Sequence, residues 1–481
     1  MSNTKLAFTI AIGERGLLIA INLISYIIVA RLVSPEDVGV FSVTSAFVAM
    51  LAIIRDFGTG YYIATTKDLT QEKLNTAFTF SFLIGFSVFL LVQAIAYPVG
   101  QYFDDHRVTT LLRLMAFNSL ILPVTGCLMT SMRRRFMFGR VFWVNLAGAL
   151  SGAFVTIGLG YLEYGSYALA LGVAANYFIS AFLAYVLKPK DIKLGVGLSG
   201  WREVFSFGGK NSVIGFLQQV SNSLLEVMVG KYFGFVEAGL LSRALGVVNL
   251  FNRDFSDAIK SVAIHSFSKA VREGRDVEDA HRVYFLNYTC FGLFYFSFVF
   301  FFSNEAIYLL SGEQWLDAVP YLKFYAVMGA ATTLYQFLPG KALALGKIDS
   351  VLRSSMLIEP VKFVVGAAVI MVFVNPLYYS ASTIFSGLFV AYVYWRNLGF
   401  VNNSFPEGLF SQFLIGLIPS VTSVYVARHL VDLNVISGDR VNLFLQGIVG
   451  GVGALVFFIL LLAVFRNPLF GAVFCFRDNK K

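Results

Sequence analysis

Long apolar stretches recur along the whole 481-residue chain and are separated by short polar loops. Most of them hold about 20 residues, the length of α-helix that crosses about 30 Å of hydrocarbon. The run at 450–465 is apolar almost throughout, whereas strands of a membrane β-barrel alternate over about ten residues. The pattern therefore predicts an all-α polytopic membrane protein with about fourteen transmembrane helices, at residues 9–31, 38–62, 76–99, 108–131, 142–161, 166–187, 208–230, 238–260, 284–309, 320–345, 356–374, 377–397, 411–431 and 443–465.

Composition supports a protein that lies almost wholly in the membrane. Hydrophobic residues make up 57% of the chain and charged residues only 14%, whereas a soluble domain carries about 25% charged residues. A large soluble core is therefore excluded, and the longest loops, at 188–207 and 261–283, are too short for a separate domain. The three cysteines show no paired spacing, so neither a disulfide framework nor a metal site is predicted.

The basic residues indicate the orientation of the chain. With the N-terminus in the cytoplasm, most Lys and Arg residues of the loops fall on the cytoplasmic side, as the positive-inside rule requires. Adding or removing one span would destroy this bias, so both termini are expected in the cytoplasm. The net charge of +9 is spread over many short loops rather than gathered in one groove, and no nucleic-acid partner is expected.

The chain contains an internal repeat whose copies both end in Arg-Asp-Phe. Arg55-Asp56-Phe57 and Arg253-Asp254-Phe255 lie near the ends of two apolar stretches, and each follows a similar turn, at 31–39 and 231–239. Six spans precede the second copy, so the copies are related by a pseudo-two-fold axis along the membrane normal. The expected organisation is an N-terminal six-helix lobe at 1–190, a cytoplasmic inter-lobe linker at 191–207, a C-terminal six-helix lobe at 208–400, and two additional helices with a cytoplasmic tail at 401–481.

Several ionisable residues fall inside the predicted spans. Charges in hydrocarbon are costly, and they usually face a cavity or one another. Because guanidinium groups bind phosphate through two parallel hydrogen bonds, the predicted substrate-binding residues are Arg15, Arg55, Arg253 and Arg243. The predicted residues for binding a coupling ion, or for balancing the arginines when substrate is absent, are Glu14, Asp56, Asp254 and Asp257.

These charged residues also have structural interpretations. Arg55 and Arg253 lie close enough to the cytoplasmic ends of their spans for their side chains to reach water. Glu359 and Lys362, three residues apart, are expected to form an ion pair within one helix. The sequence contains no nucleotide-binding loop, nucleophile elbow or soluble carboxylate pair, so an enzyme is not predicted. No cofactor is expected, and coupling to Na⁺, H⁺ or the membrane potential stays open.

Four sequence motifs resemble those of a known transporter family. They are "ARLVSPEDVGVFSV" at 30–43, "RDFGTGYYIATTKDLT" at 55–70, "GKYFGFVEAGLLSRA" at 230–244 and "LLSGEQWLDAVPYLKFYA" at 309–326. Through them the chain resembles the polysaccharide transporter (Wzx-type flippase) family of the multidrug/oligosaccharidyl-lipid/polysaccharide exporter superfamily, in particular its exopolysaccharide, colanic-acid-like branch. The resemblance extends over nearly the whole chain.

The resemblance implies two six-helix lobes that work by alternating access. The implied substrate is an undecaprenyl-pyrophosphate-linked oligosaccharide, moved from the cytoplasmic to the outer leaflet of a bacterial inner membrane for exopolysaccharide or O-antigen synthesis. Besides this polyprenyl-pyrophosphate-linked oligosaccharide and the lipid bilayer, the resemblance allows polysaccharide polymerase machinery as a partner. Related lipid flippases line their cavity with arginines on the first, second and eighth helices, which here carry Arg15, Arg55 and Arg253. The family often has proline near the end of the eighth helix, where this chain has His265.

Two other functions stay open at this point. A small-molecule drug or cation antiporter of the same superfamily would prefer acidic cavity residues without neighbouring arginines, whereas here an Arg precedes each Asp of the repeat. A membrane polysaccharide polymerase or ligase usually needs a long outer loop that presents catalytic groups, and the outer loops predicted here are short.

Overall fold

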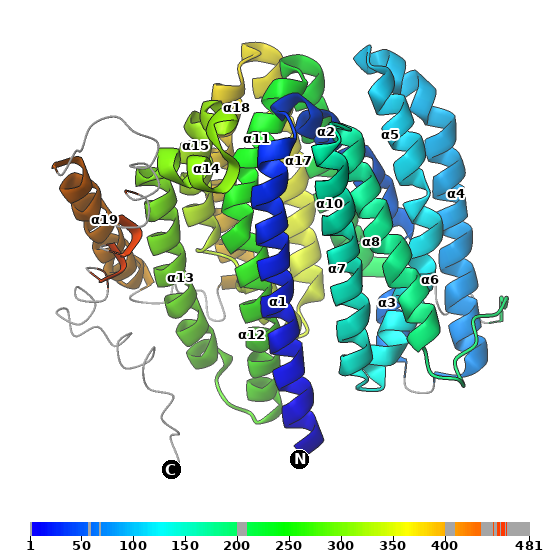
Figure 1. Ribbon diagram of the computed structural model, residues 1–481. Coiled ribbons are helices and arrows are strands. Elements are labelled where there is room, and N and C mark those ends of the chain that lie inside the picture. The colour runs from blue at the N-terminus through cyan, green and yellow to red at the C-terminus, as the bar shows by residue number, and fades with distance from the viewer. Residues whose placement is uncertain are drawn as a thin grey trace. The chain divides into compact units, whose positions relative to one another are not determined.

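The computed structural model describes residues 2–55, 59–66, 69–199, 209–399 and 409–433, together with a few residues between 446 and 458. Within these residues the chain is helical and contains no strand, which confirms the all-α class (Figure 1). The chain divides into two compact units, Met1–Gly239 and Leu240–Lys481. The division at 191–207, which the repeat suggests, stays a prediction.

The first unit is built mainly of long helices. α7 packs along α8 and against α1, α4 packs against α5 and α6, and α2 packs along α10. The helices of this unit are α1 (Ser2–Leu32), α2 (Pro35–Arg55), α3 (Thr59–Thr65), α4 (Gln71–Phe103), α5 (His106–Ala116), α6 (Asn118–Arg134), α7 (Phe138–Tyr161), α8 (Ser166–Leu187) and α10 (Gly209–Phe233).

The second unit contains more short and irregular helices. α15 packs against α18, α17 against α18, and α13 along α19. The helices, the first of which begins at the end of the first unit, are α11 (Phe235–Asn249), η1 (Leu250–Phe255), α12 (Ser256–Arg272), α13 (Val277–Phe301), α14 (Ser303–Ser311), η2 (Glu313–Ala318), α15 (Val319–Thr332), α16 (Leu338–Ala344), α17 (Ile348–Phe373), α18 (Pro376–Tyr394), η3 (Trp395–Gly399) and α19 (Leu409–Leu433).

The helices are those of a multi-pass membrane protein. In the described part of the chain, seven helical segments are long and apolar enough to cross a membrane: Pro35–Ala52, Gln71–Phe103, His106–Arg134, Phe138–Tyr161, Ser166–Leu187, Val277–Phe301 and Ile348–Phe373. All the predicted spans up to 411–431 coincide with helices, whereas 443–465 lies largely outside the described residues.

Some predicted spans consist of two or three shorter helices. The span at 320–345 is divided into α15 and α16. At the end of α15, the hydroxyls of Thr332 and Thr333 donate hydrogen bonds to backbone carbonyls three residues earlier. Pro339, in the first turn of α16, has no N–H group to continue the preceding helix. Similar breaks separate α5 from α6 and α13 from α14.

The two copies of the repeated turn meet each other within the first unit. A Cβ atom on Gly39 would lie 1.7 Å from the carbonyl oxygen of Phe235, and one on Gly239 would lie 1.9 Å from that of Pro35. Each copy therefore contacts the other through the same pair of positions, as a two-fold axis between them requires. Small residues allow this backbone-to-backbone approach of membrane helices.

We expect Gly39→Ala to destabilise the protein by about 1–3 kcal/mol or more, because a backbone carbonyl must move to admit the methyl group. Thermal unfolding of the purified protein in detergent measures the loss. Gly126→Ala in α6 is the matched control, because a Cβ there meets no atom within 4 Å. The control should be neutral or slightly stabilising, since alanine favours helix over glycine. An equal loss of stability in both variants would show that the close approach at Gly39 does not restrict the side chain there.

Candidate functional site

Three of the four predicted substrate-binding arginines lie on three different helices. Arg15 is in α1, Arg55 is the last residue of α2, and Arg253 is in η1 together with Asp254. The structure describes the backbone at these positions, and their side chains, like that of Glu14, lie outside its description. Asp56 lies wholly outside the described residues.

The second Arg-Asp-Phe lies in a π-helical turn. This turn, η1, connects α11 to α12 and is braced by side chains from the second unit. The hydroxyl of Thr332 donates a hydrogen bond of 2.9 Å to Oδ1 of Asn252, and Nε2 of Gln336 donates one of 3.3 Å to the carbonyl of Asn252. Ser256 Oγ donates to the carbonyl of Phe251 at 3.2 Å. π-Helical turns occur frequently at functional sites, and the substrate-binding role of Arg253 stays a prediction.

Arg243 lies in the interior against an aromatic ring. Its side chain, in α11, is buried, and its guanidinium carbon lies 4.3 Å from the centre of the Trp315 ring. Trp315, in η2, is fully buried. Two of the motifs that suggested the family resemblance thus meet in a cation–π contact, which holds α11 against η2.

Two other charged positions are paired within their own helices. Asp257 is exposed in the first turn of α12, and its carboxylate lies 3.2 Å from the ammonium group of Lys260. Glu359 and Lys362 lie 3.0 Å apart in α17, so the ion pair predicted from their spacing is confirmed. Within the described residues, no group of three His, Cys, Asp or Glu side chains could hold a metal ion.

A carboxylate and a hydroxyl connect α2 to α10 inside the first unit. The hydroxyl of Ser42 donates a hydrogen bond to Glu226. Glu226 is on the same helix as Gln219, whose amide donates to Ser223 Oγ at 2.9 Å. α10 therefore presents polar groups at membrane depth. Gln219 and Glu226 are polar positions in the apolar span predicted at 208–230, but no spacing rule connects Glu226 with Ser42.

A network of charges ties three loops together in the first unit. Arg107 forms ion pairs with Asp105, at 2.7 Å, with Asp37, at 3.5 Å, and with Glu36. Asp37 also accepts a hydrogen bond from the backbone N–H of Ser166 at 3.1 Å. Burial alone would raise the pKa of Asp105, but the hydrogen bonds from Arg107 outweigh it and hold that pKa below its usual value.

We expect Asp105→Asn to destabilise the protein less than Asp105→Ala. Asparagine can still cap α5, where Asp105 accepts a hydrogen bond from the backbone N–H of Arg107, whereas alanine loses the cap at a further cost of about 1 kcal/mol. Because the folded-state pKa of Asp105 is depressed, its ion pair stabilises the protein above pH 3.8 and is lost as the pH falls further. The thermal stabilities of wild type and Asp105→Asn should therefore converge on acidification, and a gap that widens would refute this.

Residues 28–320 match the family described as "Polysaccharide biosynthesis protein". The teichuronic acid biosynthesis protein TuaB of Bacillus subtilis (strain 168) is 21% identical over 319 residues, which cover 62% of this chain and 62% of TuaB. The lipopolysaccharide biosynthesis protein WzxC of Escherichia coli (strain K12) is 18% identical over 339 residues, covering 69% of this chain and 68% of WzxC. The chain thus spans less than two thirds of the length of TuaB.

A solved structure extends the likeness to nearly the whole chain. The lipid II flippase MurJ, in an inward closed conformation, superimposes on this chain with a TM-score of 0.72. The superposition covers 96% of this chain and 100% of the MurJ chain. The sequence identity is 12%, so this likeness shows a shared fold.

Proposed function

The chain belongs to the polysaccharide biosynthesis protein family, and from this premise we propose that it moves a lipid-linked oligosaccharide across a bacterial inner membrane. The substrate would be an undecaprenyl-pyrophosphate-linked repeat unit for exopolysaccharide or O-antigen synthesis. Transport would proceed by alternating access, with both termini in the cytoplasm and without catalysis of a covalent step.

The observation that carries this proposal is the fold shared with a lipid II flippase over 96% of the chain. Lipid II and the proposed substrate both place a polar saccharide on a membrane lipid, so both need a path that shields polar groups from hydrocarbon. The names of TuaB and WzxC support a role in polysaccharide or lipopolysaccharide biosynthesis.

The arginines of the repeat give the proposal its chemistry. Arg15, Arg55 and Arg253 would bind the pyrophosphate, because guanidinium groups match phosphate oxygens in bidentate geometry. Arg243, the fourth arginine predicted to bind substrate, is buried against Trp315 in the second unit. The carboxylates Asp56 and Asp254, which follow Arg55 and Arg253 in the chain, would balance the arginine charge or bind a coupling ion, together with Glu14 and Asp257.

The proposal is tested by measuring lipid-linked oligosaccharide separately in the two leaflets after depletion of the protein. We expect the substrate to accumulate in the cytoplasmic leaflet and to reach the outer leaflet again when the wild-type gene is restored. Normal outward transfer after depletion would remove the flippase function.

A further inference from the structure

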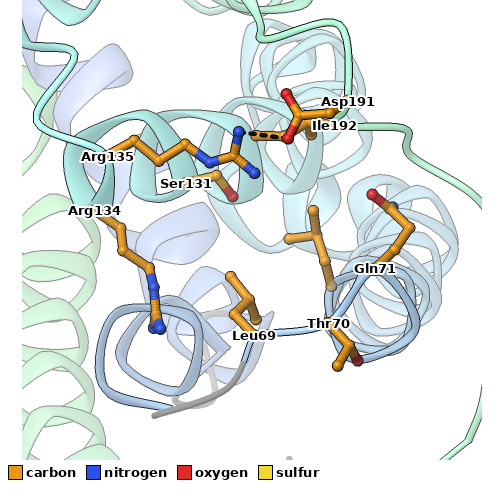
Figure 2. Close-up of a pocket in the computed structure, with 9 residues that line it drawn as sticks. Leu69, Thr70, Gln71, Ser131, Arg134, Arg135, Asp191 and Ile192 are labelled. Atoms are coloured by element: carbon orange, nitrogen blue, oxygen red, sulfur yellow. Dashed lines mark hydrogen bonds and ion pairs between the residues drawn. The ribbon is translucent and has the colours of Figure 1, made fainter.

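A polar pocket opens in the first unit, where the ends of several helices meet. Its volume is about 320 Å³. Figure 2 shows the side chains that line it, from the start of α4, the end of α6 and the segment after α8. They are Leu69, Thr70, Gln71, Leu74, Ser131, Arg134, Arg135, Asp191 and Ile192.

The segment at 188–199 forms one wall of the pocket and is fastened to α4 by hydrogen bonds. Asn75 Oδ1 accepts from the backbone N–H of Gly195 at 3.1 Å, and Thr79 Oγ1 accepts from that of Gly197 at 3.0 Å. Thr76 Oγ1 donates to the carbonyl of Ser199 at 2.7 Å. These three hydrogen bonds therefore fix the position of the segment on α4.

A second wall is fixed by Arg134 and by the buried cluster beneath it. Arg134 Nη1 donates hydrogen bonds to the carbonyls of Ile63, at 3.0 Å, and Thr66, at 2.5 Å, at the end of α3. Ile63 belongs to an apolar cluster that joins α3, α4 and α6, together with Tyr62, Leu74, Leu128 and Met132. The end of α6 thus presents its arginines from a rigid base.

The guanidinium group of Arg135 forms an exposed ion pair with Asp191. Its Nη1 lies 2.6 Å from Oδ2 of Asp191 (Figure 2), but the two side chains are 43% and 65% exposed. The hydrogen bond from Arg135 lowers the pKa of Asp191, so this carboxylate is charged at neutral pH. Exposed ion pairs contribute little to stability, so a ligand with more negative charge can replace the Asp191 carboxylate at small cost.

The surroundings favour an anion. The loops that meet at this ion pair carry seven basic residues, Arg133, Arg134, Arg135, Arg140, Lys188, Lys190 and Lys193, and one acidic residue, Asp191. The first turn of α4 also lines the pocket, at Thr70 and Gln71. It adds one acidic and one basic residue, Glu72 and Lys73, so the excess of basic residues remains.

We propose that this pocket binds a phosphate-bearing anion, which takes the place of Asp191 on Arg135. The site lies where two membrane-length segments end, at Gln71 and at Arg134, so both a lipid headgroup and a phosphate from the aqueous phase can reach it. Displacement of Asp191 would loosen the segment at 188–199 from α6 while its hydrogen bonds to α4 persist. The proposal requires no assumption about the transported substrate.

The experiment measures binding, with two probes and four variants. Inorganic pyrophosphate is titrated into purified full-length protein in detergent by calorimetry. In a second arm, native mass spectrometry counts phosphatidylglycerol retained by protein from nanodiscs of phosphatidylglycerol and phosphatidylcholine. The variants are Arg135→Ala, Arg135→Lys, Asp191→Asn and Arg140→Ala. The last is the matched control: Arg140 belongs to the same basic surface but does not line the pocket, and it bonds the carbonyl of Leu187.

We expect Arg135→Ala to weaken binding about tenfold, the effect of one charge-assisted hydrogen bond, and Arg135→Lys to weaken it less. Asp191→Asn should strengthen binding by up to about fivefold, because it removes the competitor for Arg135. If the ion pair served only to hold the structure, Arg135→Ala and Asp191→Asn would both weaken binding. An effect in the pyrophosphate arm identifies a phosphate from the aqueous phase, and an effect in the nanodisc arm alone identifies a lipid headgroup.

Equal losses in Arg135→Ala and Arg140→Ala, or an Asp191→Asn variant that binds no more tightly than wild type, would overturn the proposal. Thermal unfolding of each variant checks that it is folded. Because the readout is binding and not export, failure here leaves the proposed transport function untouched.

Discussion

Arg55→Ala and Arg253→Ala are each expected to abolish export of the lipid-linked oligosaccharide. Each substitution would remove a guanidinium group that makes two charge-assisted hydrogen bonds to pyrophosphate. Their loss costs about 3 kcal/mol, which is more than a hundredfold in rate. Lysine keeps the charge but not the bidentate geometry, so Arg55→Lys and Arg253→Lys should retain part of the export. Leaflet-resolved quantification in a depleted strain measures the effect.

The control for these variants is Arg275→Ala. Arg275 lies in an exposed loop after α12 and pairs with Glu273, and its side chain is 62% exposed. Its loss should leave export at the wild-type level, because exposed ion pairs contribute little. All variants must be compared at equal protein abundance in the membrane. Wild-type export by both alanine variants would remove Arg55 and Arg253 from the substrate path.

Glu278→Gln is expected to destabilise the protein by about 3–5 kcal/mol, because it leaves a buried ammonium group without its counter-charge. Lys341, in α16, is 1% exposed and forms an ion pair with Glu278 in the first turn of α13. His281 Nδ1 lies 3.6 Å from the same carboxylate. The reverse substitution, Lys341→Met, should cost far less, about 1 kcal/mol, since Glu278 is 33% exposed and can be hydrated.

This asymmetry is the decisive part of the second prediction. Thermal unfolding in detergent should rank Glu278→Gln well below Lys341→Met, and the double variant should recover to about the level of Lys341→Met. Glu273→Gln is the control, because Glu273 and Lys269 form an exposed pair at 3.9 Å and the change should stay within about 0.5 kcal/mol. Equal losses in the two single variants would show that Lys341 is not held by Glu278.

The parts of the structure that depend on local sequence could be predicted. Apolar runs of about 20 residues give helices, because the period and length of a spanning helix are set by the backbone and the membrane. The pair of Glu359 with Lys362 followed from a spacing of three residues on one helix. The repeat predicted two related copies of a turn, and these copies contact each other at Gly39 and Gly239.

The parts that depend on packing could not be predicted. No spacing rule connects Arg107 with Glu36, Lys341 with Glu278, or Arg243 with Trp315, because each partner is brought close by the way separate helices pack. The division of spans into shorter helices was missed for a related reason. Hydrophobicity does not show where a spanning segment is interrupted, as it is after Thr332 at the end of α15. The predicted roles of Arg15, Arg55 and Arg253 stay predictions.

The reciprocal contact of Gly39 with Gly239 bears on the ancestry of the chain. Each copy of the turn supplies the partner of the other, so the contact needs two like surfaces and no covalent link between them. A chain of half the length, carrying one copy, would present the same surface to a second copy of itself. In the present chain, neither glycine can gain a side chain without striking the backbone of the other copy of the turn. The two halves are thus obliged to stay alike at this point, however far the rest of their sequences drift apart.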